Sequence, residues 1–159
     1  MKNLENLELK NSFYELGADF FQKKSPDPVS SPYLINSNPD AIELIGLDLS
    51  EVQNPKFVEY FSGNLLLTNS RPLAMTYSGH QFGSYNPRLG DGRGLLLGEV
   101  KDAKNDFLDI YLKGSGPTRF ARGFDGRATL RASIREYLGG EAVHGLGIPT
   151  SRSLAIIGT

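Results

Sequence analysis

Three features of the sequence have residue types suited to binding a phosphate group. They are the run Gly90-Asp-Gly-Arg-Gly94, Lys113 and Glu136, in this order along the chain. Glycine lets backbone N–H groups approach an oxyanion, Arg and Lys supply positive charge, and a carboxylate can hold a lysine in position. Each feature alone is common and is typical of an ordinary turn, a solvated lysine or a surface glutamate. Their order along one chain is what predicts a nucleotide site.

The strands expected around these features place Lys113 at the end of a β-hairpin. Residues 94–100 and 107–113 are rich in Leu, Ile and Val and are separated by a polar turn, which is typical of a hairpin. Because side chains alternate along a strand, Asp109, Tyr111 and Lys113 are expected on one face.

A helix is expected next, from about Asp125, which would cap it, to His144. It would end at the glycines after residue 144. Leu130, Ile134 and Leu138 form its predicted apolar face. Glu136 falls on a second face of small residues, which would let the helix approach the sheet and direct Glu136 at Lys113.

The remaining elements are predicted from shorter signals. Apolar spacing favours an N-terminal helix up to about Lys24, and Tyr33 begins a short strand candidate. Asn38-Pro39 and Asn54-Pro55 are each typical of a helix start. Residues 151–157 are expected to join the hairpin strands in one antiparallel sheet. The chain stops directly after that strand, which favours a fragment of a longer protein.

Composition excludes several classes of protein. The chain has 159 residues, 39% of them hydrophobic, and a net charge of −1, so it is expected to be globular and without a general affinity for nucleic acid. It has no Cys and only two His, which excludes disulfides, thiolate catalysis and Cys-built metal sites. No membrane-spanning or signal segment is recognisable, so a cytoplasmic protein without a membrane partner is expected.

The charge is distributed unevenly. Between Lys113 and Arg135 six basic residues accompany a single acid, Asp125. This favours an anion site, although a solvated surface has the same composition. An RNA-binding module using residues 119–135 is a third possibility. Such a module would have aromatic residues between its arginines, and only Phe120 and Phe124 qualify.

The order of glycine turn, strand lysine and helix glutamate is similar to that in the N-terminal lobe of protein kinases. Longer sequence motifs around these features are more specific for one protein family. They are Tyr77-Ser-Gly-His-Gln-Phe-Gly83, Leu89-Gly-Asp-Gly-Arg-Gly94, Leu112-Lys-Gly-Ser-Gly116, Asp125-Gly-Arg-Ala128, Ser133-Ile-Arg-Glu136 and Gly147-Ile-Pro-Thr-Ser-Arg152. Together they resemble the selenoprotein O family, strongly over residues 73–157 and loosely before.

The resemblance implies an α+β, protein-kinase-like N-terminal lobe that binds ATP in a flipped orientation. It also implies a protein adenylyltransferase, which transfers AMP to hydroxyl side chains of proteins. By this resemblance Lys113 and Glu136 are the catalytic pair of this chain. The nucleotide-binding positions would be Gly90, Gly92, Arg93, Lys113, Asp125 and Gly126.

The resemblance further implies that the chain is only part of such an enzyme. Residues 1–72 would be an acidic, helical N-terminal extension and residues 73–159 the nucleotide-binding lobe. The general-base aspartate and the ligands of Mg²⁺ or Mn²⁺ would lie beyond Thr159, so that no metal ligand belongs to this chain and the fragment alone would be inactive. A non-catalytic, pseudokinase-like scaffold that binds ATP without transfer is the alternative.

Overall fold

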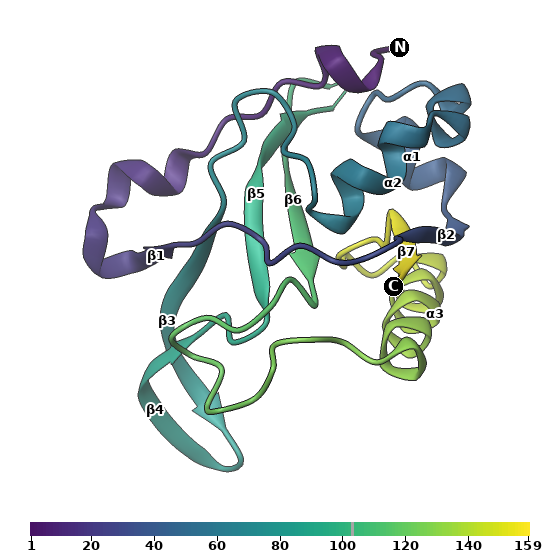
Figure 1. Cartoon of the computed structure of the whole chain (residues 1–159). Coiled ribbons are helices and arrows are strands. Elements are labelled where there is room, and N and C mark those ends of the chain that lie inside the picture. The colour runs from purple at the N-terminus through teal and green to yellow at the C-terminus, as the bar shows by residue number, and fades with distance from the viewer. Residues whose placement is uncertain (103) are drawn as a thin grey trace.

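The computed structural model describes residues 1–102 and 104–159. It is a mixed α+β structure built on a five-stranded antiparallel sheet in the order β1-β3-β5-β6, with β4 paired to β3, as Figure 1 shows. The strands are β1 (Phe21–Lys23), β3 (Leu73–Gln81), β4 (Ser84–Gly90), β5 (Gly94–Lys101) and β6 (Phe107–Lys113). A separate two-stranded sheet pairs β2 (Tyr33–Ser37) with β7 (Ala155–Gly158). The antiparallel sheet and the α+β class agree with the prediction.

The predicted hairpin is confirmed. β5 and β6 pair antiparallel, with Gly94 opposite Lys113 and Lys101 opposite Phe107. β5 is apolar over most of its length because its side chains are buried on both faces. The register places the start of β5 and the end of β6, and therefore Arg93 and Lys113, at the same edge of the sheet.

One hydrophobic core contains residues from both halves of the chain. Leu4, Leu7 and Ile42 from the first half are buried in it together with Leu95 and Ile110 from the hairpin. The acidic N-terminal segment therefore packs directly on the sheet that carries Lys113.

The two short helices with Asn-Pro starts are also confirmed. α1 (Pro39–Leu44) is capped by the Asn38 side chain, which accepts from the N–H of Ala41. α2 (Pro55–Ser62) is capped by Asn54 and buries Phe57 and Phe61. Between them lies the 3₁₀ helix η4 (Leu49–Gln53). These starts were predictable because a cap acts on the residues next to it.

The predicted N-terminal helix is wrong. Three 3₁₀ turns occupy this region, η1 (Leu4–Asn6), η2 (Ser12–Leu16) and η3 (Ala18–Phe20), and β1 follows. Gly17 lies between two of the turns with φ 92°, a conformation that interrupts a right-handed helix. Leu16 and Phe20 are each 51% exposed, so the apolar spacing does not correspond to a buried face.

The start of the long helix is corrected as well. α3 runs Leu130–Gly145, and its cap is Thr129, not Asp125. The preceding Gly126 has φ 71°, in the left-handed region, so the chain cannot continue as a right-handed helix through this point.

The position of the last strand and the packing of α3 also differ from the prediction. β7 is antiparallel to β2, not part of the sheet that contains the hairpin. α3 lies beside β7, away from the larger sheet (Figure 1). Its predicted apolar face is consequently exposed: Leu130, Ile134 and Leu138 are 49%, 39% and 62% exposed. Among the described residues, none of the helices is both long enough and apolar enough to cross a bilayer.

Candidate active site

Lys113 and Glu136 meet as an ion pair. Lys113 is the last residue of β6, and its Nζ lies 3.0 Å from Oε2 of Glu136, in the second turn of α3. Their side chains are 43% and 62% exposed, so the pair contributes only about 0–1 kcal/mol to stability. The hydrogen bond from Lys113 and its positive charge hold the pKa of the Glu136 carboxyl below its usual value. The arrangement is suited to positioning the lysine ammonium rather than to holding the fold together.

An open cavity of about 360 Å³ lies against Lys113, and this volume is within the range of small-molecule sites. Its cationic side chains are Lys113 and Arg127, and Ser30, Ser133 and Thr159 have hydroxyl groups. The rest of the lining is Pro28, Val29, Gly114, Ala128 and Ile157. Two cations and several hydroxyls around one cavity are suited to an anionic ligand.

Arg93 lies next to this pair. Its carbonyl accepts hydrogen bonds from the N–H groups of Gly114, at 2.7 Å, and Ser115, at 3.3 Å. Its positive charge adds to that of Lys113 in lowering the pKa of Glu136. The structure thus brings Arg93, Lys113 and Glu136 together at one edge of the sheet.

The glycine turn between β4 and β5 is covered by a neighbouring loop. A Cβ on Gly90 would overlap the Phe120 ring, and a Cβ on Gly92 would lie 2.9 Å from the Phe120 carbonyl oxygen. Thr118 also donates to the Asp91 carbonyl through its hydroxyl, and its N–H donates to the carbonyl of Gly92 at 3.3 Å. Packing against residues 118–121 is therefore sufficient to explain why both positions are glycine.

Asp125 and Gly126 have local roles in the loop before α3. The Asp125 carboxylate accepts from the N–H of Arg127 at 2.9 Å, which is a turn contact and not a helix cap. Gly126 is buried, and its carbonyl accepts from the N–H of Gly116 at 3.2 Å. A Cβ on Gly126 would overlap the Gly116–Pro117 backbone. In the described part of the chain, neither residue belongs to the lining of the cavity beside Lys113, and nor do Gly90, Gly92 and Arg93.

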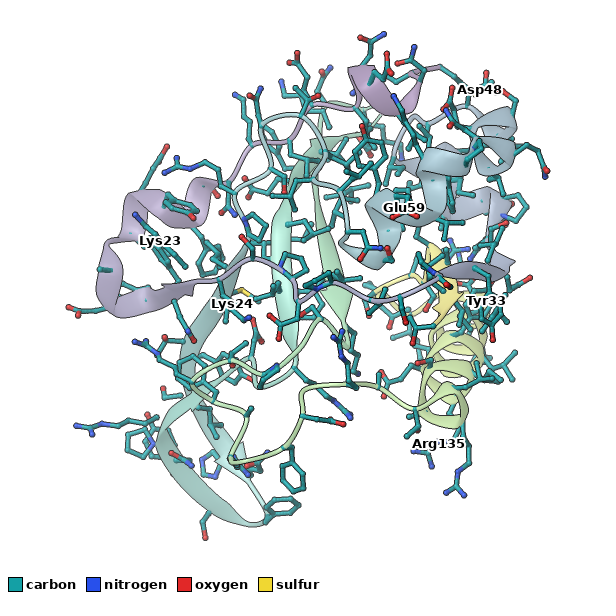
Figure 2. The ribbon with its side chains drawn as sticks, in the orientation of Figure 1. Lys23, Lys24, Tyr33, Asp48, Glu59 and Arg135 are labelled. Atoms are coloured by element: carbon teal, nitrogen blue, oxygen red, sulfur yellow. The ribbon has the colours of Figure 1, made fainter. Side chains whose placement is uncertain are left out.

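Arg127, Arg131 and Arg135 recur every four residues and would form a stripe on one continuous helix, but this stripe is interrupted. Arg127 precedes α3, and its guanidinium donates to the carbonyls of Gly114, Pro28 and Asp27 at 3.2–3.4 Å. Arg131 and Arg135 lie on α3, and Figure 2 shows Arg135 projecting from the helix into solvent. Because Arg127 serves to join two loops, the stripe does not form a continuous surface for RNA.

Comparison with known proteins identifies the family. The sequence matches the family described as protein adenylyltransferase SelO over residues 3–159. The chain belongs to this family. Curated relatives named protein nucleotidyltransferase YdiU come from Pseudomonas entomophila and Myxococcus xanthus, each 52% identical, and from Photobacterium profundum, 51% identical. Each similarity extends over all 159 residues of this chain but over only 33%, 33% and 31% of the relative. The chain therefore spans about a third of the length of these relatives.

Sequence reasoning missed one buried residue of the site in this SelO-family chain. Asp91 is 9% exposed and lies inside the glycine turn. Its Oδ2 accepts from the N–H of Met75 at 2.9 Å, and it also accepts from the Tyr111 hydroxyl. Burial raises the pKa of Asp91, and burial together with the Asp91 charge raises the pKa of Tyr111. The alternation of side chains along residues 107–113 had placed Tyr111 on the same strand face as Lys113. This was the sequence signal that pointed toward the neighbourhood of Asp91.

The contribution of the segment between β1 and β2 to the site was not predicted from the sequence. This segment crosses the front of the sheet in Figure 1. The N–H of Asp27 donates to the carbonyl of Ser115 at 2.8 Å, and the next three residues line the cavity. Part of the acidic N-terminal segment of this SelO-family chain thus forms one wall of the candidate site. No local sequence signal connects these residues to Lys113.

Proposed function

We propose that this chain is the ATP-binding N-terminal part of a protein adenylyltransferase with a kinase-like lobe. Residues 73–159 would bind the nucleotide, and residues 1–72 would be an extension that completes one wall of the cavity. The single observation that carries the proposal is the Lys113–Glu136 pair at 3.0 Å beside an open, cationic cavity.

The reaction of the full-length protein would be a transfer of AMP. A Ser, Thr or Tyr hydroxyl of the acceptor protein attacks the α-phosphorus of ATP. The bond from this phosphorus to the oxygen bridging the α- and β-phosphates breaks, pyrophosphate leaves, and the hydroxyl proton is released to a base. Lys113 would stabilise negative charge on the phosphates as the leaving group departs, a role for which a positioned cation is well suited. Glu136 would act by orienting that cation, and Arg93 would add a second one.

The proposal places the ligands of Mg²⁺ or Mn²⁺ in parts of the full-length protein outside this chain. Among the described residues, no group of three His, Cys, Asp or Glu side chains is arranged to hold a metal ion. Gly90, Gly92, Asp125 and Gly126 remain proposed nucleotide positions that would act through backbone shape.

The test is transfer of label from α-phosphate-labelled ATP by the full-length protein. Lys113→Ala is expected to reduce transfer at least about 100-fold, because one well-placed electrostatic contact to the transition state has this effect. Lys101→Ala, on the same sheet but at the other end of the hairpin, is the matched control and should transfer normally. Transfer at the wild-type rate by Lys113→Ala would contradict the proposal. Wild-type protein that binds ATP without any transfer would favour the scaffold.

A further inference from the structure

The β3–β4 hairpin is a projecting feature, of which the proposed site uses only the last residue, Gly90. β3 pairs with β5 only at Leu73 opposite Leu96, whereas Thr76 to Gln81 pair with β4. Figure 1 shows the hairpin extending away from the rest of the sheet, with the loop that follows β6 beside it. The outer part of this hairpin is therefore a two-stranded ribbon, which is stable only with support from other segments.

The tip of the hairpin displays aromatic side chains to solvent. Phe82 is 92% exposed and Tyr85 is 59% exposed, and on the adjacent loop Phe124 is 76% exposed. Phe82 has φ 53° and Gly83 has φ 78°, the geometry of a tight turn in which Asn, Asp or Gly is usual at both positions. A bulky residue at such a φ is costly, so Phe82 occupies a position that neither its backbone preference nor its solvation favours.

The segments that form this hairpin and loop carry arginines and contain no acidic residue up to Asp91 and Asp125, which directly follow them. The sequence has no Asp or Glu between Glu59 and Asp91, and none between Asp109 and Asp125. These two stretches form the hairpin and the loop, and they contain Arg88, Arg119 and Arg122. Among the described residues, none of these three arginines forms a salt bridge.

The loop fixes the hairpin and connects it to the glycine turn. Arg122 donates to the side-chain oxygen of Gln81 at 2.7 Å, and Arg119 donates to the hydroxyl of Thr76 at 2.8 Å. Phe120, between these two arginines, packs on Gly90. The loop therefore runs beside the ribbon from its tip to Gly90, so an extended partner bound at the tip could follow the ribbon toward the proposed nucleotide site.

We propose that this hairpin-tip surface, made of Phe82, Tyr85, Arg88, Arg122 and Phe124, docks an acidic segment of the acceptor protein. Uncompensated arginines select negative charge, and exposed aromatic side chains supply contact area at low entropic cost. The inference rests on the proposed function for the identity of the partner as the acceptor. A polypeptide is favoured over RNA because the same hairpin ends at Gly90, a proposed nucleotide position, and an acceptor protein must reach that site with its hydroxyl.

The test uses the full-length protein and two probes, a copolymer of Glu and Tyr and a copolymer of Lys and Tyr. Binding of each copolymer is measured by fluorescence anisotropy, separately from transfer of label from α-phosphate-labelled ATP. The wild type should bind the acidic copolymer more tightly, and the binding should weaken with added salt. Arg88→Glu with Arg122→Glu should weaken it about tenfold or more. Phe82→Ser, at a side chain with almost no packing to lose, should weaken it by a smaller factor.

The matched control is Lys101→Glu with Lys104→Glu, which changes the charge equally at the opposite end of the β5–β6 hairpin. It should leave binding of the acidic copolymer unchanged. Equal weakening by both double variants, or no weakening by either, would overturn the docking surface. A single-stranded RNA that binds more tightly than the copolymer and is lost in the Arg88/Arg122 variant would overturn the choice of partner. Absence of transfer by the wild type would count against the proposed function alone, because docking is measured without it.

Discussion

β6 and α3 carry the two halves of one ion pair, but the two elements are held in different ways. β6 is hydrogen-bonded along its length to β5, in which Leu95, Leu96 and Leu97 are buried. None of the residues of α3, all of which the structure describes, is buried. Polar contacts hold the helix instead: the Lys113–Glu136 pair, and a two-pronged contact from Arg152 to Glu141 at 2.7 and 2.6 Å.

This difference indicates which half of the pair can move. Burial of apolar surface is the largest stabilising contribution in folding, whereas exposed ion pairs contribute little. Lys113 therefore has a position set by the core, and Glu136 has a position set by a few contacts at one side of a helix. Elements with few buried apolar contacts are the ones that open most easily. The position of α3 is thus the variable that decides whether Lys113 is oriented.

The largest expected effect comes from adding one methyl group at a tightly packed residue between β6 and α3 and one at an open position of α3. Gly126→Ala introduces a Cβ into the Gly116–Pro117 backbone at a residue with φ 71°. It should destabilise the protein by about 2–4 kcal/mol. Gly139→Ala, in α3, has open space around the new atom and should stabilise by about 0.5–1 kcal/mol. Thermal unfolding of the full-length variants measures both, and shifts of the same sign would contradict the difference between the packed loop and the open face of α3.

Asp91 tests how far the buried sheet region depends on the hydrogen bonds of one carboxylate. Asp91→Ala leaves the N–H of Met75 and the hydroxyl of Tyr111 without their acceptor, which should cost about 1–3 kcal/mol. The glycine turn should loosen as well, so affinity for ATP should fall in calorimetry. Asp91→Asn keeps one acceptor oxygen and is the milder control. Unchanged stability in Asp91→Ala would show that the turn does not depend on this carboxylate.

The raised pKa of Asp91 also predicts a pH dependence. Because burial disfavours the charged carboxylate, this group contributes most to stability below the ordinary pKa of 3.8, and the contribution is lost as pH rises through the raised value. The stability of Asp91→Asn relative to wild type should therefore increase as pH rises from 3.8. Thermal midpoints of both proteins across this range check the sign, and a constant difference would contradict it.

A smaller effect is expected from loosening α3. Arg152 is 13% exposed and Glu141 is 26% exposed, so Arg152→Lys, which loses the planar two-pronged contact, should cost about 1 kcal/mol. Hydrogen exchange of α3 amides should become faster while exchange in β5 and β6 is unchanged. Arg135→Lys, at a residue exposed on the same helix, is the control. Faster exchange in both regions would mean that α3 and the sheet open as one unit.

The smallest effect on stability is expected from Glu136→Gln, because its pair with Lys113 is exposed. The change in stability should be about 0–1 kcal/mol. It should disappear as pH falls from the ordinary carboxyl pKa of 4.5 through the lowered pKa of Glu136, because the carboxylate is then protonated. AMP transfer by the full-length protein should nevertheless fall by about tenfold, since the orientation of Lys113 is lost. Transfer at the wild-type rate would assign Glu136 no positioning role.

Local signals in the sequence were enough for several elements of the structure. Alternation and a polar turn identified β5 and β6, and Asn-Pro steps identified α1 and α2. These features depend on residues that are neighbours in the chain or in one hairpin, so their energetics are the same wherever the segment lies.

Tertiary structure alone decided the rest. The pairing of β7 with β2 joins residues from opposite ends of the chain, and the residues before β2 line the cavity of Lys113. Phe120 occupies the space beside Gly90 and Gly92, which composition alone would leave open for a ligand. Each of these depends on which distant segment packs most favourably at a given place. No pattern within a short stretch of sequence determines which distant segment packs there. The outcome depends on the burial and hydrogen bonding of the whole chain at once.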